Sequence, residues 1–371
     1  MGGWVNLLSR ALAVAVTLVA AGVAVLVAVA ATQAARTIVS ISTEPLRDVT
    51  LSLPGLASTP ALDLPGIAGK IGRGERVNLL VLGYGGAGHD GAFLSDTILV
   101  ASIQPKDGTV TLLSVPRDLW VALPASRYSG SYHGKVNEAF SIAASHGDRD
   151  AGMKMAASIV GGVVGIGIDR TVAIDFHGFR KLVDGVGGVD VVVDRSFTAA
   201  YPRNDDADID PSWIFVSFAK GPQHMDGERA LRFSRARYSD GPEGSDFARS
   251  ARQQKVILAA KDRVVERGLL PSLLTLLDTL RDNVRTDLSL ADMNALAELA
   301  RGYDDGRTVH AALTTENVLE ELTLREAGAI VLSALRPRTI DDWTEVQAYV
   351  RGVIEPARSR RADPEPIPGT R

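Results

Sequence analysis

Short apolar runs and amphipathic stretches follow one another along the chain after residue 76. Runs of roughly four to eight residues rich in Val, Leu and Ile predict strands buried on both faces. Apolar residues at intervals of three and four predict helices with one buried side. Their alternation predicts an α/β domain with a central sheet. The expected strands are 77–82, 97–103, 110–115, 170–175 and 189–193, and the expected helices are 138–144, 152–164, 179–184, 227–233 and 247–267.

The pattern after residue 267 is helical throughout. It leaves open whether these helices pack on the sheet or form a separate subdomain. The Pro- and Arg-rich end, 356–371, is predicted to be disordered. The domain is therefore expected to span 77–355, with further helices at 269–280, 290–301, 315–322, 326–335 and 339–351.

The beginning of the chain is apolar over a length that suits a membrane. Residues 11–32 carry no charge, and about 20 apolar residues cross a bilayer core. Residues 1–10 then form a short cytoplasmic tail with Arg10 on the inner side. A cleaved signal peptide is the alternative, because the segment 28–35 offers small-residue cleavage sites. Either way the remainder lies outside the cytoplasm, after a proline-rich linker at 33–76.

Composition excludes several kinds of site. The net charge of -4 argues against a general nucleic-acid binder, since affinity for the phosphate backbone needs a basic surface. The chain has no cysteine, which excludes disulfides, thiolate metal sites and a cysteine nucleophile. His89, His133 and His224 have no partner at metal-ligand spacing, so we expect them to be structural.

A glycine-rich loop follows the first predicted strand. Gly83 to Gly88 satisfy the G-x-G-x-x-G pattern, but a dinucleotide site also needs a helix directly afterwards. Only residues 89–96 separate this loop from the next strand, so the dinucleotide interpretation fails. Asp90 and Asp96 remain as two carboxylates that either stabilise the loop or bind Mg²⁺, which favours carboxylates together with phosphate oxygens.

Arginines gather near predicted strand and helix ends. The planar fork of donors on arginine matches phosphate oxygens. Each arginine alone is explained by salt bridges with acids such as Asp118, Asp240, Glu243 and Asp246, but the set favours a polyphosphate ligand. The set comprises Arg117 after the third strand, Arg235 and Arg237 two residues apart, and Arg249, Arg252 and Gln253 on one helix face.

Six motifs occur in a fixed order between residues 77 and about 260. They are LSDTI at 94–98, LSVPRD at 113–118, GKVNEA at 134–139, VGGVD at 186–190, GPQHMDG at 221–227, and the arginine-rich stretch 235–254. Each motif alone is weak, but the series resembles the LytR-CpsA-Psr family over roughly half of the chain. The resemblance implies an α-β-α sandwich around a central mixed sheet, with an apolar pocket for a polyprenyl tail.

The resemblance also implies an activity. The enzyme would be a phosphotransferase that moves a glycopolymer from a polyprenyl-pyrophosphate carrier to a hydroxyl of peptidoglycan. It would be a single-pass protein of the bacterial cell membrane, with the catalytic domain outside. Asp96 and Asp90 would bind Mg²⁺. The catalytic residues would be Arg117, Asp118, Arg235 and Arg237, and the pyrophosphate would be bound by Arg117, Lys135, Arg235, Arg237, Arg249, Arg252 and Gln253.

The sequence departs from the family pattern at two positions. Family members often have an aspartate where Gly85 stands and an arginine where Leu94 stands. For this reason Asp90 is expected as the second metal ligand. Asp118 is expected either to orient an arginine or to accept the proton of the hydroxyl. Two other functions remain open: a hydrolase or pyrophosphatase of the same lipid, and a non-catalytic receptor for lipid-linked glycan.

Overall fold

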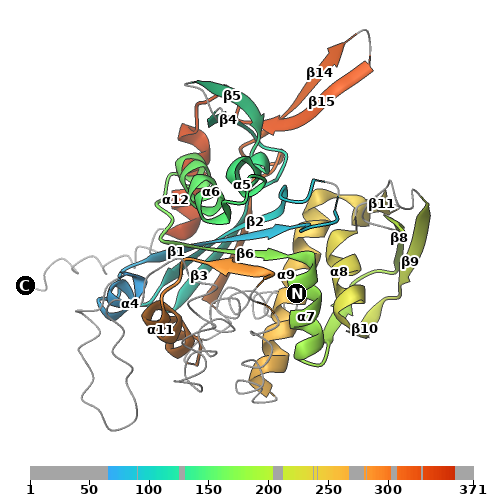
Figure 1. Cartoon of the computed structure of the whole chain (residues 1–371), viewed down its shortest axis with the longest axis horizontal. Helices are drawn as coiled ribbons and strands as arrows, with labels where there is room; N and C mark the ends of the chain where they lie inside the picture. The colour runs from blue at the N-terminus through green and yellow to red at the C-terminus, as the bar shows by residue number, and fades with distance from the viewer. Residues whose placement is uncertain are drawn as a thin grey trace, which may run out of the picture.

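A six-stranded mixed sheet forms the centre of the computed structural model (Figure 1). The structure describes residues 66–89, 91–124, 130–203, 212–236, 238–239, 241–266, 280, 282–301, 307–326 and 329–355. The strand order is β12-β6-β1-β2-β3-β13. These strands are β1 (Val77–Tyr84), β2 (Ser95–Gln104), β3 (Thr109–Ser114), β6 (Arg170–Asp175), β12 (Val284–Thr286) and β13 (Thr308–Ala312).

The strand directions bring several chain ends to one edge of the sheet. β1 is parallel to β6 and β3 is parallel to β13, while β2 runs antiparallel to β1 and β3. β12 runs antiparallel to β6. The carboxyl ends of β1, β3, β6 and β13 therefore meet the amino ends of β2 and β12. Ligands of open α/β sheets usually bind at such an edge.

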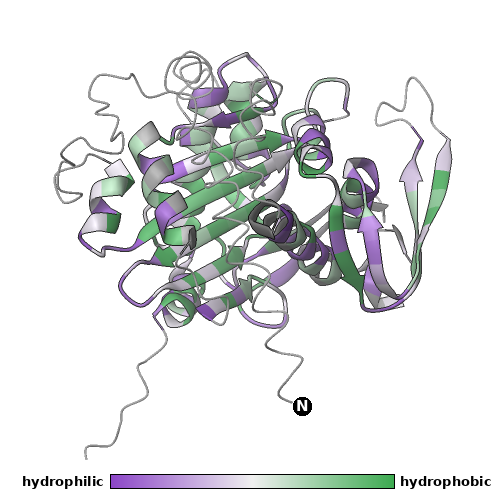
Figure 2. Ribbon diagram, turned by 90° about the horizontal axis from the view of Figure 1, so that it is seen from below, coloured by the Kyte–Doolittle hydropathy of each residue, from purple (hydrophilic) through white to green (hydrophobic). Residues whose placement is uncertain are grey.

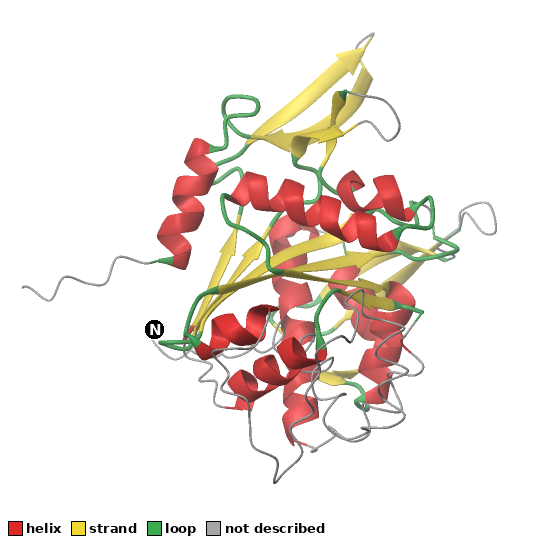
Figure 3. Ribbon diagram, turned by 60° about the vertical axis from the view of Figure 1, so that its left-hand side comes forward, coloured by secondary structure: helices red, strands yellow, loops and turns green. Residues whose placement is uncertain are grey.

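The sheet is buried on both faces, as the apolar runs predicted. Along β1, Leu79 and Val81 enter one core and Leu80 and Leu82 enter the other, because successive side chains of a strand alternate. Figure 2 shows the central strands as the hydrophobic part of the molecule. Figure 3 shows helices on both sides of the sheet, which confirms the predicted α/β layers around a central mixed sheet.

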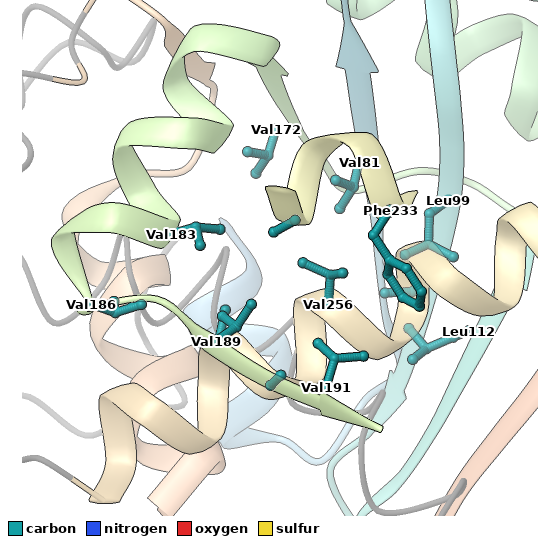
Figure 4. Close-up of a cluster of buried hydrophobic side chains, with 14 of the residues drawn as sticks. Val81, Leu99, Leu112, Val172, Val183, Val186, Val189, Val191, Phe233 and Val256 are labelled. Atoms are coloured by element: carbon teal, nitrogen blue, oxygen red, sulfur yellow. The ribbon is translucent and has the colours of Figure 1, made fainter. Parts of the chain in front are cut away.

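Each core has its own set of helices. In the first core, strand residues such as Val81 and Leu99 face Phe233 and Val256 of two helices (Figure 4). That core is covered by α4 (Gly66–Gly72), α7 (Phe176–Gly185), α8 (Gly227–Arg235), α9 (Asp246–Glu266) and α11 (Leu290–Arg301). The opposite core is covered by α5 (Glu138–Ala144), α6 (Arg149–Val164) and α12 (Thr344–Ile354).

Smaller sheets surround this sandwich. In Figure 1 the β14–β15 hairpin projects away from the other elements. Three of these sheets have two strands each: β4 (Trp120–Pro124) with β5 (Ser131–Lys135), β7 (Val189–Val193) with β10 (Gly221–Met225), and β14 (Glu320–Glu326) with β15 (Ala329–Arg336). The fourth has three strands, β8 (Phe197–Pro202), β9 (Trp213–Phe218) and β11 (Tyr238–Ser239). The short helix η2 (Gly241–Gly244) precedes α9.

Two of the predicted C-terminal helices were wrong. Residues 315–322 and 326–335 contribute to the β14–β15 hairpin instead. The register pairs Leu322 with Ala334 and Leu324 with Leu332, so alternate residues share one face. The predicted helix 290–301 is confirmed as α11, and the helix expected at 339–351 begins at Thr344. Residues 269–279 lie outside the described part.

The predicted linker contains a helix that its sequence did not indicate. The amide of Ala68 in α4 donates to Asp292 Oδ1 of α11 at 2.9 Å, and Ile67 is buried in the first core. So short a helix depends on such tertiary contacts. The predicted membrane segment 11–32 and tail 356–371 lie outside the described residues. Among the helices that the structure describes, none has both the length and the apolar character to cross a bilayer.

Candidate active site

The glycine-rich loop lies at the sheet edge where the strand ends meet. Gly86 and Gly88 have φ angles of 88° and 81°, a backbone region that favours glycine. The amide of Gly86 donates to the carbonyl of Ala92 at 2.7 Å, which folds the loop back toward β2. No helix occurs between β1 and β2 in residues 85–89 and 91–94, which agrees with the rejection of a dinucleotide site.

A cavity of about 380 Å³ opens on the β2–β3–β13 side of this edge; we call it the β3 cavity. Its polar end is formed by Asp96, Arg117, Arg249 and Gln253, four of the residues that the sequence predicted for the site. The other lining residues are mixed: Ile98, Leu99, Val115, Leu313 and Leu335 are apolar, whereas Glu316 and Glu321 add two carboxylates. The cavity thus combines guanidinium groups with apolar side chains.

Arg117 lies between two carboxylates. Its Nη1 donates to Asp96 Oδ1, and its Nε lies 3.4 Å from Asp118 Oδ2. Lys135 Nζ donates to Asp118 Oδ1 at 2.6 Å. The charges alternate from Asp96 to Lys135, so Arg117 is held on both sides and Lys135 acts on it through Asp118. This geometry suits Asp118 as a residue that orients an arginine.

Arg249 is presented by α9. Only 7% of this residue is exposed, and it lines the polar end of the β3 cavity together with Gln253, one turn further along. A guanidinium that has left water requires good polar partners. Arg249 and Arg117 line the same cavity, and the guanidinium group of arginine is suited to phosphate.

Arg252 points into the protein instead. Its Nε donates to the carbonyl of Phe233 at 3.0 Å, its Nη1 to Glu243 Oε2 at 2.9 Å, and its Nη2 to the carbonyl of Ala236 at 2.5 Å. Its guanidinium lies 5.1 Å from the ring centroid of Phe197, and burial lowers its pKa. These contacts tie α9 to the end of α8, so the geometry gives Arg252 a structural role. Its part in pyrophosphate binding stays a prediction.

Arg235 lies on the other side of the glycine-rich loop. Its Nη2 is 3.1 Å from Nε2 of His89, and its guanidinium is 4.2 Å from the ring centroid of Phe176. A guanidinium only donates hydrogen bonds, so His89 Nε2 is the acceptor. All three line a second cavity of about 620 Å³ beside the end of β6, the β6 cavity. Arg235 and Arg117 thus line different cavities, and the part of Arg235 in pyrophosphate binding stays a prediction. Arg237 and Asp90 lie outside the described residues.

Comparison with known proteins identifies the family. The model of the LytR_cpsA_psr family matches residues 58–332. The chain belongs to the LytR-CpsA-Psr family. The match begins inside the region predicted as a linker, and it includes α4 and most of the β14–β15 hairpin.

Individual relatives are transferases of the cell wall. The chain is 31% identical over 209 residues to polyisoprenyl-teichoic acid–peptidoglycan teichoic acid transferase TagV of Bacillus subtilis, which covers 56% of the chain and 49% of TagV. It is 32% identical over 226 residues to the transferase TagU of Enterococcus faecalis, and this match covers 60% of the chain and 65% of TagU. The chain therefore spans less than two thirds of the length of these two relatives.

Solved structures share the fold. The crystal structure of Bacillus subtilis TagV superposes with a TM-score of 0.53 at 24% identity, covering 76% of this chain and 98% of TagV. Protein gbs0355 of Streptococcus agalactiae superposes with a TM-score of 0.57 at 24% identity, covering 77% of this chain and 90% of gbs0355. The similarity supports the mixed α/β architecture of the LytR-CpsA-Psr family for this chain.

The loop differs from the usual pattern of the family where a metal ligand is expected. A Cβ added at Gly85 would lie 2.6 Å from Cγ of His89, so His89 fills the space that an aspartate at position 85 would need. Among the residues that the structure describes, no three His, Cys, Asp or Glu side chains form a metal cluster. Mg²⁺ is often held by one or two carboxylates with phosphate and water. Asp96 beside two arginines fits that arrangement, and Asp90 stays a prediction.

Sequence reasoning missed part of the β3 cavity. Ala312 and Thr314, which follow β13, and Glu321 of β14 line the β3 cavity. Residues 315–322 and 326–335 were predicted to be helices, and β13 was not recognised as a strand, so these neighbours were not expected. The alternation of Leu322 and Leu324 was the one pattern that indicated a strand here.

Proposed function

We propose that this chain transfers a glycopolymer from a polyprenyl-pyrophosphate carrier to a hydroxyl group of peptidoglycan. The observation that carries the proposal is the β3 cavity, whose lining combines Arg117 and Arg249 with apolar side chains such as Ile98, Leu313 and Leu335. A pyrophosphate followed by an isoprenyl chain needs both, since it has a charged head and an apolar tail. The names of TagV and TagU describe transfer of this kind.

The transfer exchanges one P–O bond for another. The acceptor oxygen forms a bond to the phosphorus that carries the glycopolymer, the bond to the bridging oxygen breaks, and polyprenyl phosphate leaves. The hydroxyl proton passes to water. Negative charge grows on the bridging oxygen, and Arg117 and Arg249 stabilise it because fixed positive groups lower the barrier of phosphoryl transfer.

Supporting residues keep this arrangement in place. Asp118 and Asp96 hold Arg117 at a fixed position, so that little reorganisation accompanies the reaction. Asp96 is the described residue that would hold Mg²⁺. A bound Mg²⁺ would offset charge on the pyrophosphate oxygens. The proposed membrane segment 11–32 would keep the domain close to its lipid substrate.

A reconstituted assay tests the proposal. The full chain in detergent is incubated with Mg²⁺, peptidoglycan and a labelled polyprenyl-pyrophosphate glycan. Label that becomes covalently attached to peptidoglycan supports the transferase. Phosphate-ended glycan without attachment would show a hydrolase, and binding without turnover would show a receptor.

Replacement of Arg117 tests the role of this arginine in the transfer. Arg117→Ala removes the guanidinium at the polar end of the β3 cavity, and we expect transfer to fall by at least about a hundredfold. Arg73→Ala is the control, since Arg73 is a solvent-exposed arginine paired with Glu75 before β1, and its variant should retain full activity. Full activity in Arg117→Ala would refute the role of this arginine.

A further inference from the structure

The β6 cavity is lined by Arg235 and by four further arginines to which the proposed transfer assigns no role. It lies on the opposite side of the glycine-rich loop from the β3 cavity, because β6 and β3 flank the β1–β2 pair in the sheet. In Figure 1, α7 and α8 lie side by side next to β6. Five arginines line the cavity: Arg149 of α6, Arg180 of α7, Arg203 after β8, and Arg232 and Arg235 of α8.

The acids of the cavity wall do not balance this charge. The described lining contains five guanidinium groups but only three carboxylates, those of Asp175, Glu228 and Asp282. Asp175 is 6% exposed and caps α7, with Oδ1 accepting from the amide of Gly178 at 2.7 Å and Oδ2 from Asn283 Nδ2 at 2.9 Å. Arginine stays charged at any working pH. The described part of the lining is therefore net positive even when its three acids are ionised.

One carboxylate is shared by two of the arginines. Glu228 Oε2 lies 3.1 Å from Arg180 Nη1, and Glu228 Oε1 lies 2.8 Å from Arg232 Nε. Each of these side chains is partly exposed, between 33% and 43%. Arg149 donates instead to the backbone carbonyl of Asp282 at 3.0 Å. Arginines from three separate helices thus line one cavity, a composition suited to recognition of an oxyanion.

We propose that the β6 cavity is a second anion-binding site, which takes a phosphate or carboxylate group carried by a sugar polymer. The position next to the glycine-rich loop places this group on the far side of the loop from the pyrophosphate. Two polymers carry such groups, the glycopolymer with repeat-unit phosphates and the peptidoglycan with peptide carboxylates. The choice of polymer rests on the proposed function, whereas the anion site itself does not.

Direct binding tests the site without any transfer reaction. The full chain in detergent is titrated calorimetrically with inorganic pyrophosphate at low salt and without Mg²⁺. We expect about two binding events per chain, one abolished by Arg117→Gln and the other weakened about tenfold by Arg232→Gln. A single event that Arg117→Gln removes completely would overturn the proposal.

Glu228→Gln is the matched variant that should change the affinity for pyrophosphate in the opposite direction. It removes the acid that Arg180 and Arg232 share, so the second binding event should tighten by about tenfold. If Arg232 and Glu228 only stabilised the fold, both variants would bind pyrophosphate more weakly than the parent. Weaker binding by both variants would therefore contradict the anion site.

Steady-state kinetics then distinguish the two polymers. If the site binds peptidoglycan, Arg232→Gln raises KM for peptidoglycan several-fold and leaves KM for the lipid-linked donor unchanged. A rise in KM for the donor alone would assign the site to the phosphates of the glycopolymer. Loss of the second pyrophosphate site with both KM values unchanged would refute binding of either polymer. Absence of transfer in the parent chain would refute the proposed function and leave the calorimetric result to decide on the anion site.

Discussion

Arg117 owes its position to its neighbours on both sides. Asp96 and Asp118 restrict the rotation of a long side chain, and Lys135 in turn restricts Asp118. A guanidinium that is already ordered loses less conformational entropy when it binds a phosphate. The two acids also offset its charge before substrate arrives. We therefore expect Asp118 to be a positioning residue rather than one that exchanges a proton.

Substitution of Asp118 tests that assignment. Asp118→Asn keeps the shape of the side chain but loses its charge, so Arg117 should become less well placed and kcat should fall about tenfold to a hundredfold. Lys135→Met should have a smaller effect in the same direction, since it acts one contact further away. Inactivity of Asp118→Asn as complete as that of Arg117→Ala would indicate that Asp118 accepts the proton.

Local spacing predicted some site residues and not others. Arg249 and Gln253 share a helix face, and the structure places both on the β3 cavity. Arg252 has equally favourable spacing, yet its partners Phe233 and Ala236 come from the preceding helix, a long-range contact that spacing does not reveal. Arg149, Arg180, Arg203 and Arg232 of the β6 cavity were missed for the same reason, because they come from separate elements.

The elements around the site depend on side chains that join one element to another. Arg252 connects α9 to the end of α8, and Arg285 after Val284 of β12 connects the sheet to α6 through Asp150. The hairpin β14–β15 is attached near the site by the amide of Leu335, which donates to the carbonyl of Asp118 at 2.9 Å. Such contacts explain how short elements keep a fixed position.

Arg252→Ala should destabilise the fold strongly. The side chain is 4% exposed, and truncation removes its hydrogen bonds to the Glu243 carboxylate and to the backbone carbonyls of Phe233, Ala236 and Glu243. We expect a loss of about 3 to 5 kcal/mol in the free energy of unfolding, measured by chemical denaturation. Arg73→Ala, at the exposed surface, should leave the denaturation midpoint unchanged. An Arg252→Ala variant as stable as the parent would show that these contacts contribute little.

The link between α6 and β12 makes stability dependent on pH. Hydrogen bonds from Arg285, at 2.7 Å to each carboxylate oxygen, hold the pKa of Asp150 below its usual value. Because the pKa of Asp150 is lower in the folded than in the unfolded state, its ionised carboxylate stabilises the fold above about pH 4. This stabilisation is lost as the pH falls further. The stability difference between the parent and Asp150→Asn should therefore be constant near neutral pH and shrink below about pH 4. A difference that stays constant in acid would contradict this.

The hairpin β14–β15 shows why part of the fold escaped prediction. The apolar residues of 315–335 fit a helical interval as well as an alternating one, and short apolar runs do not distinguish the two. The inner strands β1, β2 and β3 were recognised because they are apolar on both faces, a pattern typical of a sheet covered by helices.

The whole molecule is a sandwich in which one sheet edge carries both cavities. The layers followed from the alternation of strands and helices, but the strand order did not, since pairing is decided by contacts far apart in sequence. The mixed order places β3 and β6 on opposite sides of the glycine-rich loop. This arrangement gives the proposed enzyme separate positions for two charged groups.

The proposed location can be tested on cells that produce the full chain. With residues 11–32 as an anchor, the protein should remain in the membrane fraction after an alkaline wash. Protease added outside intact protoplasts should digest the domain, because the domain would face outward. Release by the alkaline wash would instead support cleavage of the segment, and protection from protease would contradict an outward orientation.

The order in which the strands are synthesised has a consequence for folding. The four inner strands come from residues 77–175, whereas β12 and β13, the outermost strands of the sheet, come from residues 284–312. Until that later part emerges, β6 and β3 expose unpaired backbone groups, which readily pair with other chains. A newly synthesised chain would thus pass through an aggregation-prone stage, and protection by chaperones would matter most before residues 284–312 have emerged.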